Sequence, residues 1–296
     1  MLPADAARCG YIALVGRPNA GKSTFFNSAL GQRLSIVTPK PQTTRGRILG
    51  ILTRPGSQMV FLDTPGLLEA SYKLHETMGR QIDLAVREAD AVLLLLDGTR
   101  PQDRNRLIKG FIERCRAPLV AALNKSDLLA PPLLQARLDG VRAEFGLGDI
   151  TPMSALNGDN LDGLLDRLAE LLPYGPQLYP EDMVAEQPER FFVAEFIREA
   201  AFNTLSDELP YSINVSIEEF AERPPKTYIR ATLHVERESQ KGIVIGRRGE
   251  RLRQIGKAAR QEIESFLDRP AFVELWVKVR SDWRNHDGAL REFGYR

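Results

Sequence analysis

The sequence has few residues of the types that build disulfide frameworks or structural metal sites. It contains two cysteines, Cys9 and Cys115, which are far apart in the chain, and three histidines. Disulfide-rich domains and zinc modules need several closely spaced cysteines or histidines. Both classes are therefore excluded, and the cysteine usage predicts a protein of the reducing cytoplasm.

Long apolar runs and a large net charge are also missing. The longest strongly apolar run covers residues 91–96, whereas a membrane-spanning helix needs about 20 residues. The formal net charge of the whole chain is +1. This value does not indicate a charged partner, so the distribution of charge along the chain has to be considered instead.

Residues 1–172 alternate between short apolar runs and helix-like stretches. Such alternation predicts an α/β domain whose mostly parallel sheet is covered by helices on both faces. Residues 48–52 and 59–62 are separated only by a turn that contains Pro55 and Gly56. This spacing predicts a hairpin, and with it one antiparallel strand in a mixed sheet.

The composition changes after residue 172. Four prolines fall within sixteen residues, at 173, 176, 180 and 188, which predicts a linker over residues 173–190. A second domain then follows over residues 191–296. Its patterns predict a helix over 191–205, strands over 211–217 and 228–235, a helix over 252–267 and a strand over 272–279.

The most informative motif has the form Gly-x4-Gly-Lys-Ser and lies between an apolar run and an amphipathic stretch. The segment comprises Gly16, Arg17, Pro18, Asn19, Ala20, Gly21, Lys22, Ser23 and Thr24. A strand, a glycine-rich turn and a helix in this order are typical of a phosphate-binding loop. The alternative is an ordinary strand-to-helix turn that happens to contain glycines.

In a phosphate-binding loop, backbone N–H groups and the start of the helix surround the phosphate oxygens. Lys22 would reach the β- and γ-phosphates, and the Ser23 hydroxyl would bind magnesium. One of Thr43 and Thr44 should bring a second hydroxyl to the magnesium, and we predict that it is Thr44. We expect the surrounding segment, residues 34–47, to become ordered around the γ-phosphate.

A second motif distinguishes guanine from adenine. It comprises Asn124, Lys125, Ser126 and Asp127, directly after the apolar run 119–123. The Asp127 carboxylate can accept hydrogen bonds from guanine N1–H and from the exocyclic amine, whereas adenine would leave it unpaired. Asn124 would brace the loop, and the Lys125 stem would lie over the base. A solvated turn is the alternative for this motif alone.

Two further segments follow strand-like runs. The first comprises Asp63, Thr64, Pro65, Gly66 and Leu67, and the second comprises Ser154, Ala155 and Leu156. Asp63 is the expected outer-shell magnesium carboxylate, and the Gly66 N–H would contact the γ-phosphate. The second segment is placed for backbone contacts to the guanine O6. These segments are ordinary loop sequences except for their positions.

The five motifs, in this order, resemble a translation-factor-type GTPase domain, and their forms resemble the bacterial Era group. The resemblance implies a P-loop GTPase domain that binds GTP or GDP with Mg²⁺ and uses Lys22, Thr44, Gly66 and Asn19 in catalysis. Leu67 occupies the position of the water-orienting glutamine of Ras-like enzymes, so we expect slow intrinsic turnover. In related GTPases an asparagine at the position of Asn19 helps to bind K⁺; a loop-bracing amide is the alternative.

The second domain contains a Gly-x-x-Gly motif at Gly246–Gly249, within a basic stretch. Residues 237–260 hold eight basic and two acidic side chains, whereas residues 184–296 hold 19 of each sign. A Gly-x-x-Gly turn clamps single-stranded RNA in KH domains. The predicted RNA-binding residues are Lys241, Ile243, Val244, Ile245, Gly246, Arg247, Arg248, Gly249, Arg251 and Arg253. Alternatively, the glycines mark ordinary helix ends, the charges form a solvated face, and the apolar residues are core.

The order of elements after residue 190 resembles an α+β type II KH domain. Residues 190–192, 208–212 and 274–279 also resemble the Era group, so the resemblance covers nearly the whole chain. It implies binding to the 3′ end of small-subunit ribosomal RNA during maturation of the small ribosomal subunit, and peripheral association with the inner membrane. The alternatives are a GTPase that acts on another RNA, and a GTP-dependent binding module for a protein or membrane with incidental hydrolysis.

Overall fold

The computed structural model describes residues 7–100, 105–206 and 208–295, which form two compact units. The first unit comprises the described residues up to Ser35, together with Thr44–Ala70 and Met78–Glu186. The second unit comprises Ile36–Thr43, Ser71–Thr77 and the described residues from Gln187 onward. Two short segments from the N-terminal half of the sequence therefore belong to the same compact unit as the C-terminal half.

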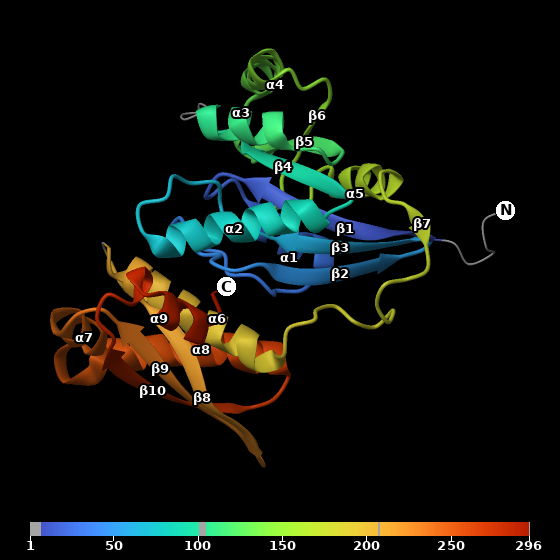
Figure 1. Ribbon diagram of the computed structural model, residues 1–296. Helices are drawn as coiled ribbons and strands as arrows, with labels where there is room; N and C mark the ends of the chain where they lie inside the picture. The colour runs from blue at the N-terminus through green and yellow to red at the C-terminus, as the bar shows by residue number, and fades with distance from the viewer. Residues whose placement is uncertain (1–6, 101–104, 207, 296) are drawn as a thin grey trace. The chain divides into compact units, whose positions relative to one another are not determined.

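The first unit is built on one mixed sheet (Figure 1). Its strand order is β2-β3-β1-β4-β5-β6, and the short β7 pairs with β1. The strands are β1 (Ala7–Gly16), β2 (Ile48–Arg54), β3 (Ser57–Asp63), β4 (Ala91–Asp97), β5 (Leu119–Asn124), β6 (Ile150–Pro152) and β7 (Tyr174–Gly175). β2 and β7 run antiparallel to their partners, and the other pairs are parallel. The predicted hairpin and the mostly parallel sheet are confirmed.

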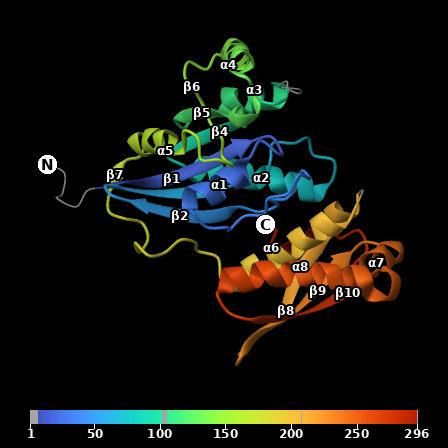
Figure 2. The ribbon, with the colours of Figure 1, turned by 180° about the vertical axis from the view of Figure 1, so that it is seen from behind.

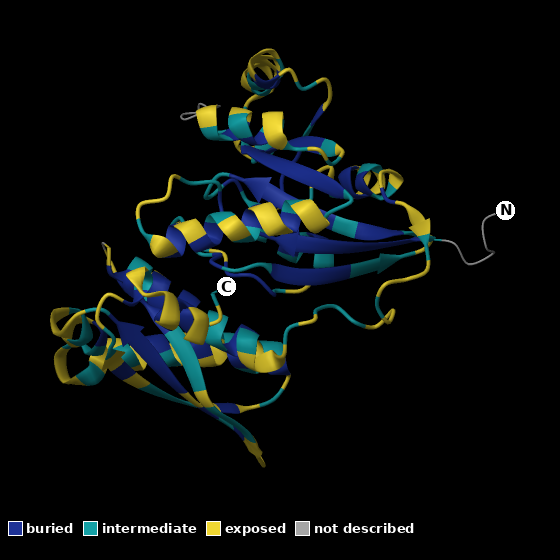
Figure 3. Cartoon of the chain, in the orientation of Figure 1, coloured by how far each residue is buried: buried dark blue, intermediate teal, exposed yellow. Residues whose placement is uncertain are grey.

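Helices cover both faces of this sheet (Figure 2). They are α1 (Lys22–Leu30), α2 (Lys73–Glu88), α3 (Asn105–Arg114), α4 (Pro131–Phe145) and α5 (Leu161–Glu170). Ile82, Phe111 and Val141, from α2, α3 and α4, share one core on one face. On the other face, Phe25 of α1 packs edge-on against Phe61, with ring centroids 5.7 Å apart. The central strands are buried along nearly their whole length (Figure 3), as expected for parallel strands between helices.

The carboxyl ends of the parallel strands meet at one edge of the sheet. Strand pairing places Gly16 opposite Leu95 and Asp97 opposite Asn124. Asp63 ends β3, which pairs with β1 in parallel. Residues that are far apart in the sequence are therefore neighbours at this edge, where open α/β sheets bind their ligands.

The predicted linker covers residues 173–190, and its part up to Glu186 packs on the first unit. β7 lies within it, and Ala185 forms a bridge with Gly50. The buried Gln58 side chain accepts hydrogen bonds from the backbone N–H groups of Leu178 (2.7 Å) and Tyr179 (3.0 Å). The segment has an extended path because the side chain of Gln58 and the edge of β2 satisfy part of its backbone.

The elements of the second unit are α6 (Glu189–Thr204), β8 (Asn214–Arg223), β9 (Lys226–Val235), α7 (Glu238–Ile245), α8 (Glu250–Leu267), β10 (Ala271–Val279) and α9 (Asp287–Glu292). They contain the predicted helix, strand, strand, helix and strand in that order, together with α7 before the second of these helices and α9 after the last strand. The sheet order is β10-β9-β8, with β10 parallel and β8 antiparallel to β9. Phe266 of α8 contacts Phe192 and Phe196 of α6, with ring centroids 5.3 Å apart in each pair. The α+β architecture is confirmed, and the Gly-x-x-Gly motif lies between the two helices α7 and α8.

Both bounds of the strand predicted over residues 211–217 are wrong, and the strand continues to Arg223. The strand expected from residue 211 begins at Asn214, because a 3-10 turn occupies Leu209–Ser212. Pro210 has no N–H to donate to a strand partner. The Ser212 hydroxyl instead donates to the Leu209 carbonyl, at 2.9 Å. Across the described ranges, the structure contains no helix that is both long and apolar enough to span a bilayer.

Candidate functional site

The predicted phosphate loop is the turn between β1 and α1, and residues 16–24 all lie in this turn or at its two ends. Two of its glycines are sterically required. A Cβ atom at Gly16 would lie 2.4 Å from the Leu95 carbonyl oxygen. Gly21 has φ +95°, and a Cβ atom there would lie 2.0 Å from Asn124 Nδ2. The tight packing forces the backbone to curl ahead of α1.

Lys22 is a buried cation at the start of α1. Its Nζ donates to the carbonyls of Gly16 (3.2 Å) and Arg17 (3.1 Å), within the loop itself. Burial lowers the pKa of Lys22 to about 8, although the nearby Asp63 charge opposes the shift. An anionic ligand in the loop would stabilise the charged form of Lys22, because it would replace the solvation that burial removes.

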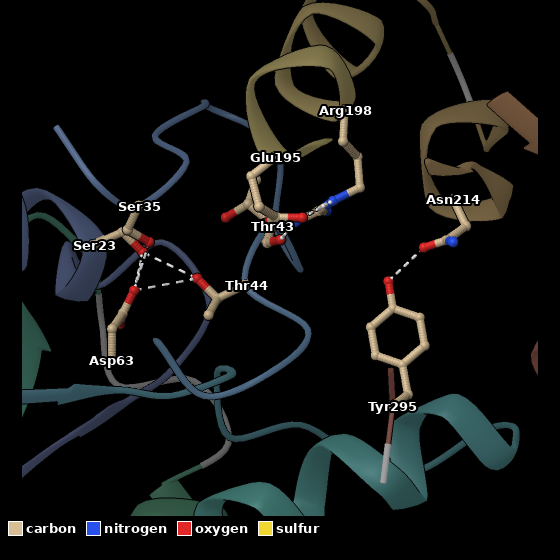
Figure 4. Close-up of polar contacts among 9 residues, drawn as sticks. All are labelled: Ser23, Ser35, Thr43, Thr44, Asp63, Glu195, Arg198, Asn214 and Tyr295. Atoms are coloured by element: carbon tan, nitrogen blue, oxygen red, sulfur yellow. Dashed lines mark hydrogen bonds and ion pairs between the residues drawn. The ribbon is translucent and has the colours of Figure 1, made fainter. Parts of the chain in front are cut away.

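Asp63 forms the centre of a cluster of hydroxyl groups (Figure 4). Its Oδ2 accepts hydrogen bonds from Ser35 (2.7 Å), Ser23 (2.9 Å) and Thr44 (3.4 Å). The Ser23 and Thr44 hydroxyl oxygens are 3.0 Å apart. Burial raises the pKa of Asp63, and the Lys22 charge and the three hydroxyl hydrogen bonds act against this shift.

The cluster fits a hard divalent cation. The other carboxylate oxygen, Asp63 Oδ1, is buried and has no hydrogen-bond partner. Magnesium prefers oxygen ligands and is held in nucleotide sites by few protein groups together with phosphate oxygens and water. Ser23 and Thr44 would supply hydroxyl ligands and Asp63 an outer-shell carboxylate. Of the two candidate threonines, Thr44 is the one whose hydroxyl lies in the cluster.

The segment after Asp63 returns to the phosphate loop. The Thr64 hydroxyl donates to the Leu14 carbonyl at 2.6 Å, and the Leu67 N–H donates to the Gly16 carbonyl at 2.9 Å. A Cβ atom at Gly66 would lie 2.6 Å from the Pro18 nitrogen. Pro65 is buried. Residues 63–67 therefore lie directly against the loop that would hold the phosphates.

Asn124 connects three parts of the site. Its Nδ2 donates to the Ala20 carbonyl at 2.9 Å, and its Oδ1 accepts from the Ala155 N–H at 2.9 Å. The Ser126 N–H donates to the Met153 carbonyl at 3.0 Å. Asp127, by contrast, is exposed. The side chain predicted to read the base is therefore accessible to a ligand, while its neighbours hold the loop in place.

The segment 154–156 differs from residue to residue in exposure. Ser154 and Ala155 are buried, and the Ser154 hydroxyl accepts a hydrogen bond from the Asn157 N–H at 3.2 Å. Leu156 is 80% exposed. A leucine this exposed does not contribute to the core, which leaves its backbone and side chain available to a ligand.

Two residues of this site were not predicted from the sequence. Asp97 accepts a hydrogen bond from Lys125 Nζ at 2.6 Å and thereby fixes the lysine side chain. Burial opposes the ionisation of Asp97, but hydrogen bonds from Lys125 and Thr99 outweigh it and hold the pKa of Asp97 below its usual value. Ser35, the second residue, binds Asp63. The position of Asp97 at the end of an apolar run was the signal available for it.

In the second unit, Gly246–Gly249 forms the predicted turn between α7 and α8. Gly246 has φ +70°, and a Cβ atom there would lie 2.7 Å from the Arg251 Cβ; Gly249 has φ +76°. Arg247 and Arg248 between them are exposed. Both positions therefore favour glycine on steric grounds, and the turn exposes two cationic side chains to solvent.

The other predicted RNA-binding residues surround this turn. Arg251 donates to the Ile243 carbonyl at 3.1 Å, and Arg253 donates to the Arg248 carbonyl at 2.5 Å. Ile243 is 48% exposed, whereas Val244 is fully buried. Val244 therefore belongs to the core, the alternative that its sequence pattern left open. Lys241 and Ile245 are partly exposed.

Two family models match the chain, one in each half. The family model described as a 50S ribosome-binding GTPase matches residues 11–125, and the KH domain model matches residues 208–284. The GTPase Era of Geotalea uraniireducens is 43% identical over 290 residues, which is 97% of this chain and 98% of the relative. The chain belongs to the Era family of GTPases.

Two solved Era structures share the fold over nearly the whole chain. A crystal structure of Aquifex aeolicus Era bound to GDP·AlF₄⁻ has a TM-score of 0.92 and 40% identity, covering 97% of this chain and 99% of that one. An Era complex with MgGDPNP and nucleotides 1506–1542 of 16S ribosomal RNA has a TM-score of 0.93 and 41% identity, covering 98% and 99%. The P-loop GTPase and KH folds of this family member are therefore shown.

The contact between Asp97 and Lys125 leads to a testable prediction. Replacing Asp97 by Ala should weaken fluorescent GDP binding roughly tenfold, because Lys125 loses its charge-assisted anchor. Equilibrium titration would measure the change. Asp139→Ala, which removes a carboxylate from the exposed surface of α4, is the matched control. Equal affinities in both variants would show that Asp97 does not order the base-binding loop.

Proposed function

We propose that this protein binds and hydrolyses GTP and binds the 3′ end of small-subunit ribosomal RNA during maturation of the small ribosomal subunit. One observation carries the proposal. The same chain combines a glycine-rich turn before α1, a magnesium-compatible hydroxyl cluster around Asp63 and an exposed Asp127 with a basic Gly-x-x-Gly turn. Membership of the Era family, and the relative solved with MgGDPNP and 16S ribosomal RNA, support it.

The chemistry at the first site consists of positioning and charge neutralisation. Phosphoryl transfer needs stabilisation of charge on the transferred group rather than a covalent step. Lys22 and the start of α1 would neutralise the phosphates, and Ser23, Thr44 and Asp63 would hold Mg²⁺. Leu67 has no group that could orient the attacking water, so unstimulated turnover should be slow. A role for K⁺ at Asn19 stays a prediction.

The chemistry at the second site is recognition of a ribose-phosphate backbone. The two glycines would allow the RNA backbone to approach the turn closely. Arg247 and Arg248, which lie between them, are exposed. Ile243 and Ile245 would contact unstacked bases, and Lys241, Arg251 and Arg253 would contact phosphates. Peripheral association with the membrane and a cytoplasmic location stay predictions.

Base specificity at the first site can be tested by exchanging one atom. Asp127→Asn should weaken GDP binding by about a hundredfold, because a carboxylate that accepts two hydrogen bonds is lost. The same variant should gain affinity for XDP, since the new amide N–H can donate to the carbonyl that xanthine has in place of the amine. Competition binding measures both. Asp149→Asn changes an exposed carboxylate of the same unit and is the control; unchanged selectivity in Asp127→Asn would refute the assignment.

RNA binding can be tested by charge reversal at the turn. Arg247→Glu combined with Arg248→Glu should weaken binding of a single-stranded ribosomal 3′-end oligonucleotide. It should also make the binding less dependent on salt, because the slope of log affinity against log salt concentration is about −0.7 for each phosphate that the protein neutralises. GDP binding should not change. Fluorescence anisotropy at several salt concentrations measures the effect.

The control for this variant is the pair Arg114→Glu and Arg116→Glu, which makes the same charge change on the exposed surface of the first unit. If the variant with Arg247→Glu and Arg248→Glu binds RNA as tightly as the wild type, the second unit does not bind RNA through Gly246–Gly249. A protein or membrane partner for this unit would then be the better hypothesis.

A further inference from the structure

An arginine is almost completely buried in α6 of the second unit. Arg198 is 1% exposed and is among the largest fully buried side chains of the described residues. Its guanidinium forms a two-point contact with Glu195, with Nε 2.9 Å from Oε1. Glu199, which is also buried, adds to the favourable electrostatics. Such burial is costly unless the charge is paired and hydrogen-bonded, so this arginine needs a structural or functional reason.

The guanidinium of Arg198 also donates a hydrogen bond to a backbone carbonyl. Its Nη2 donates to the carbonyl oxygen of Thr43 at 2.6 Å (Figure 4). Thr43 ends the segment Ile36–Thr43, which belongs to the same compact unit as α6. A second cation holds this segment, because Lys40 Nζ donates to the carbonyls of Phe202 and Leu205 at the end of α6. The last carbonyls of a helix have no partner within the helix and favour a positive charge.

The peptide bond after Thr43 connects this contact to the nucleotide site. The Thr43 carbonyl and the Thr44 nitrogen lie in one rigid peptide plane. A hydrogen bond to that carbonyl therefore restricts the orientation of Thr44. The Thr44 hydroxyl is the group that lies 3.0 Å from Ser23 Oγ and 3.4 Å from Asp63 Oδ2.

We infer that Arg198 is a positioning residue for Thr44 and that it favours the triphosphate over the diphosphate. The inference rests on the proposed function, in which Thr44 helps to hold Mg²⁺, and it takes this Thr44 contact to form only when the γ-phosphate is present. The guanidinium holds the Thr43–Thr44 peptide in the orientation that this state needs. Because α6 belongs to the same unit as the Gly-x-x-Gly turn, the same contact makes nucleotide preference sensitive to the state of α6.

A purely structural role would predict a different outcome. If Arg198 only neutralises Glu195 and Glu199, its loss should lower the stability of the second unit and leave nucleotide preference unchanged. A positioning role should weaken one nucleotide selectively. The ratio of GDPNP affinity to GDP affinity in the presence of Mg²⁺ therefore separates the two roles.

The experiment compares variants of the full chain by titration with fluorescent GDP and GDPNP. Arg198→Met should bind GDPNP about tenfold more weakly, a change of about 1.4 kcal/mol, with GDP affinity unchanged. Arg198→Lys keeps the charge but cannot span Glu195 and Thr43 together, so it should fall between the wild type and Arg198→Met. Arg190→Met, which removes an exposed arginine from the same helix, should change neither affinity.

Two further variants keep the test decisive. Lys40→Met loosens the same segment without creating a cavity in α6, and it should also reduce GDPNP affinity selectively, by less than Arg198→Met. The inference would be overturned if GDPNP and GDP affinities fell equally in Arg198→Met, or if either Arg198→Met or Lys40→Met kept the GDPNP affinity of the wild type. Thr44→Ala tests the proposed function separately, because a normal GDPNP preference in that variant would mean that Thr44 is not the triphosphate-sensing ligand.

Discussion

The first unit buries a cation and a carboxylate of opposite charge at the carboxyl edge of its sheet, and its functional geometry depends on this arrangement. Removing Lys22 and Asp63 from water costs several kcal/mol per ion unless other groups compensate. Loop carbonyls compensate for Lys22, and three hydroxyl groups compensate for one oxygen of Asp63. The other oxygen remains without a partner. A polyanion with a divalent cation would complete both environments, which explains why this fold specifies such a ligand.

At the proposed RNA site of the second unit, the geometry depends on the backbone conformation of two glycines and not on buried charges. Gly246 and Gly249 adopt positive φ values, and the packing of Arg251 against Gly246 excludes a side chain at the first of these positions. The resulting sharp turn keeps Arg247 and Arg248 exposed. Arg198 and Glu199 of this unit are buried elsewhere, and Arg198 contacts a segment that continues into the nucleotide site. The two kinds of site are therefore connected through the chain itself.

The sequence was sufficient to predict the elements whose chemistry is local. The phosphate loop, the Asn124–Asp127 motif and the Gly-x-x-Gly turn each depend on residues within a few positions of one another. The contributions of Asp97, Ser35 and Arg198 were not predicted, because each acts on a residue that is distant in the sequence. Of the three, Asp97 had a sequence signal, its position at the end of an apolar run. Strand pairing brings Asp97 next to Asn124, and the packing of Ile36–Thr43 in the second unit brings Thr43 to Arg198. The burial of Val244 likewise depends on tertiary packing, which an apolar run of three residues does not determine.

The most direct test of this account is the dependence of nucleotide binding on magnesium. Calorimetric titration of the full chain with GDPNP, and with the corresponding adenine nucleotide, should be carried out with Mg²⁺ and with a chelator. The account predicts that Mg²⁺ strongly increases GDPNP affinity and that the adenine nucleotide binds weakly in both conditions. GDPNP binding that is independent of Mg²⁺, or equal affinity for the two bases, would contradict the assignment of the buried charges to a magnesium–guanosine triphosphate site.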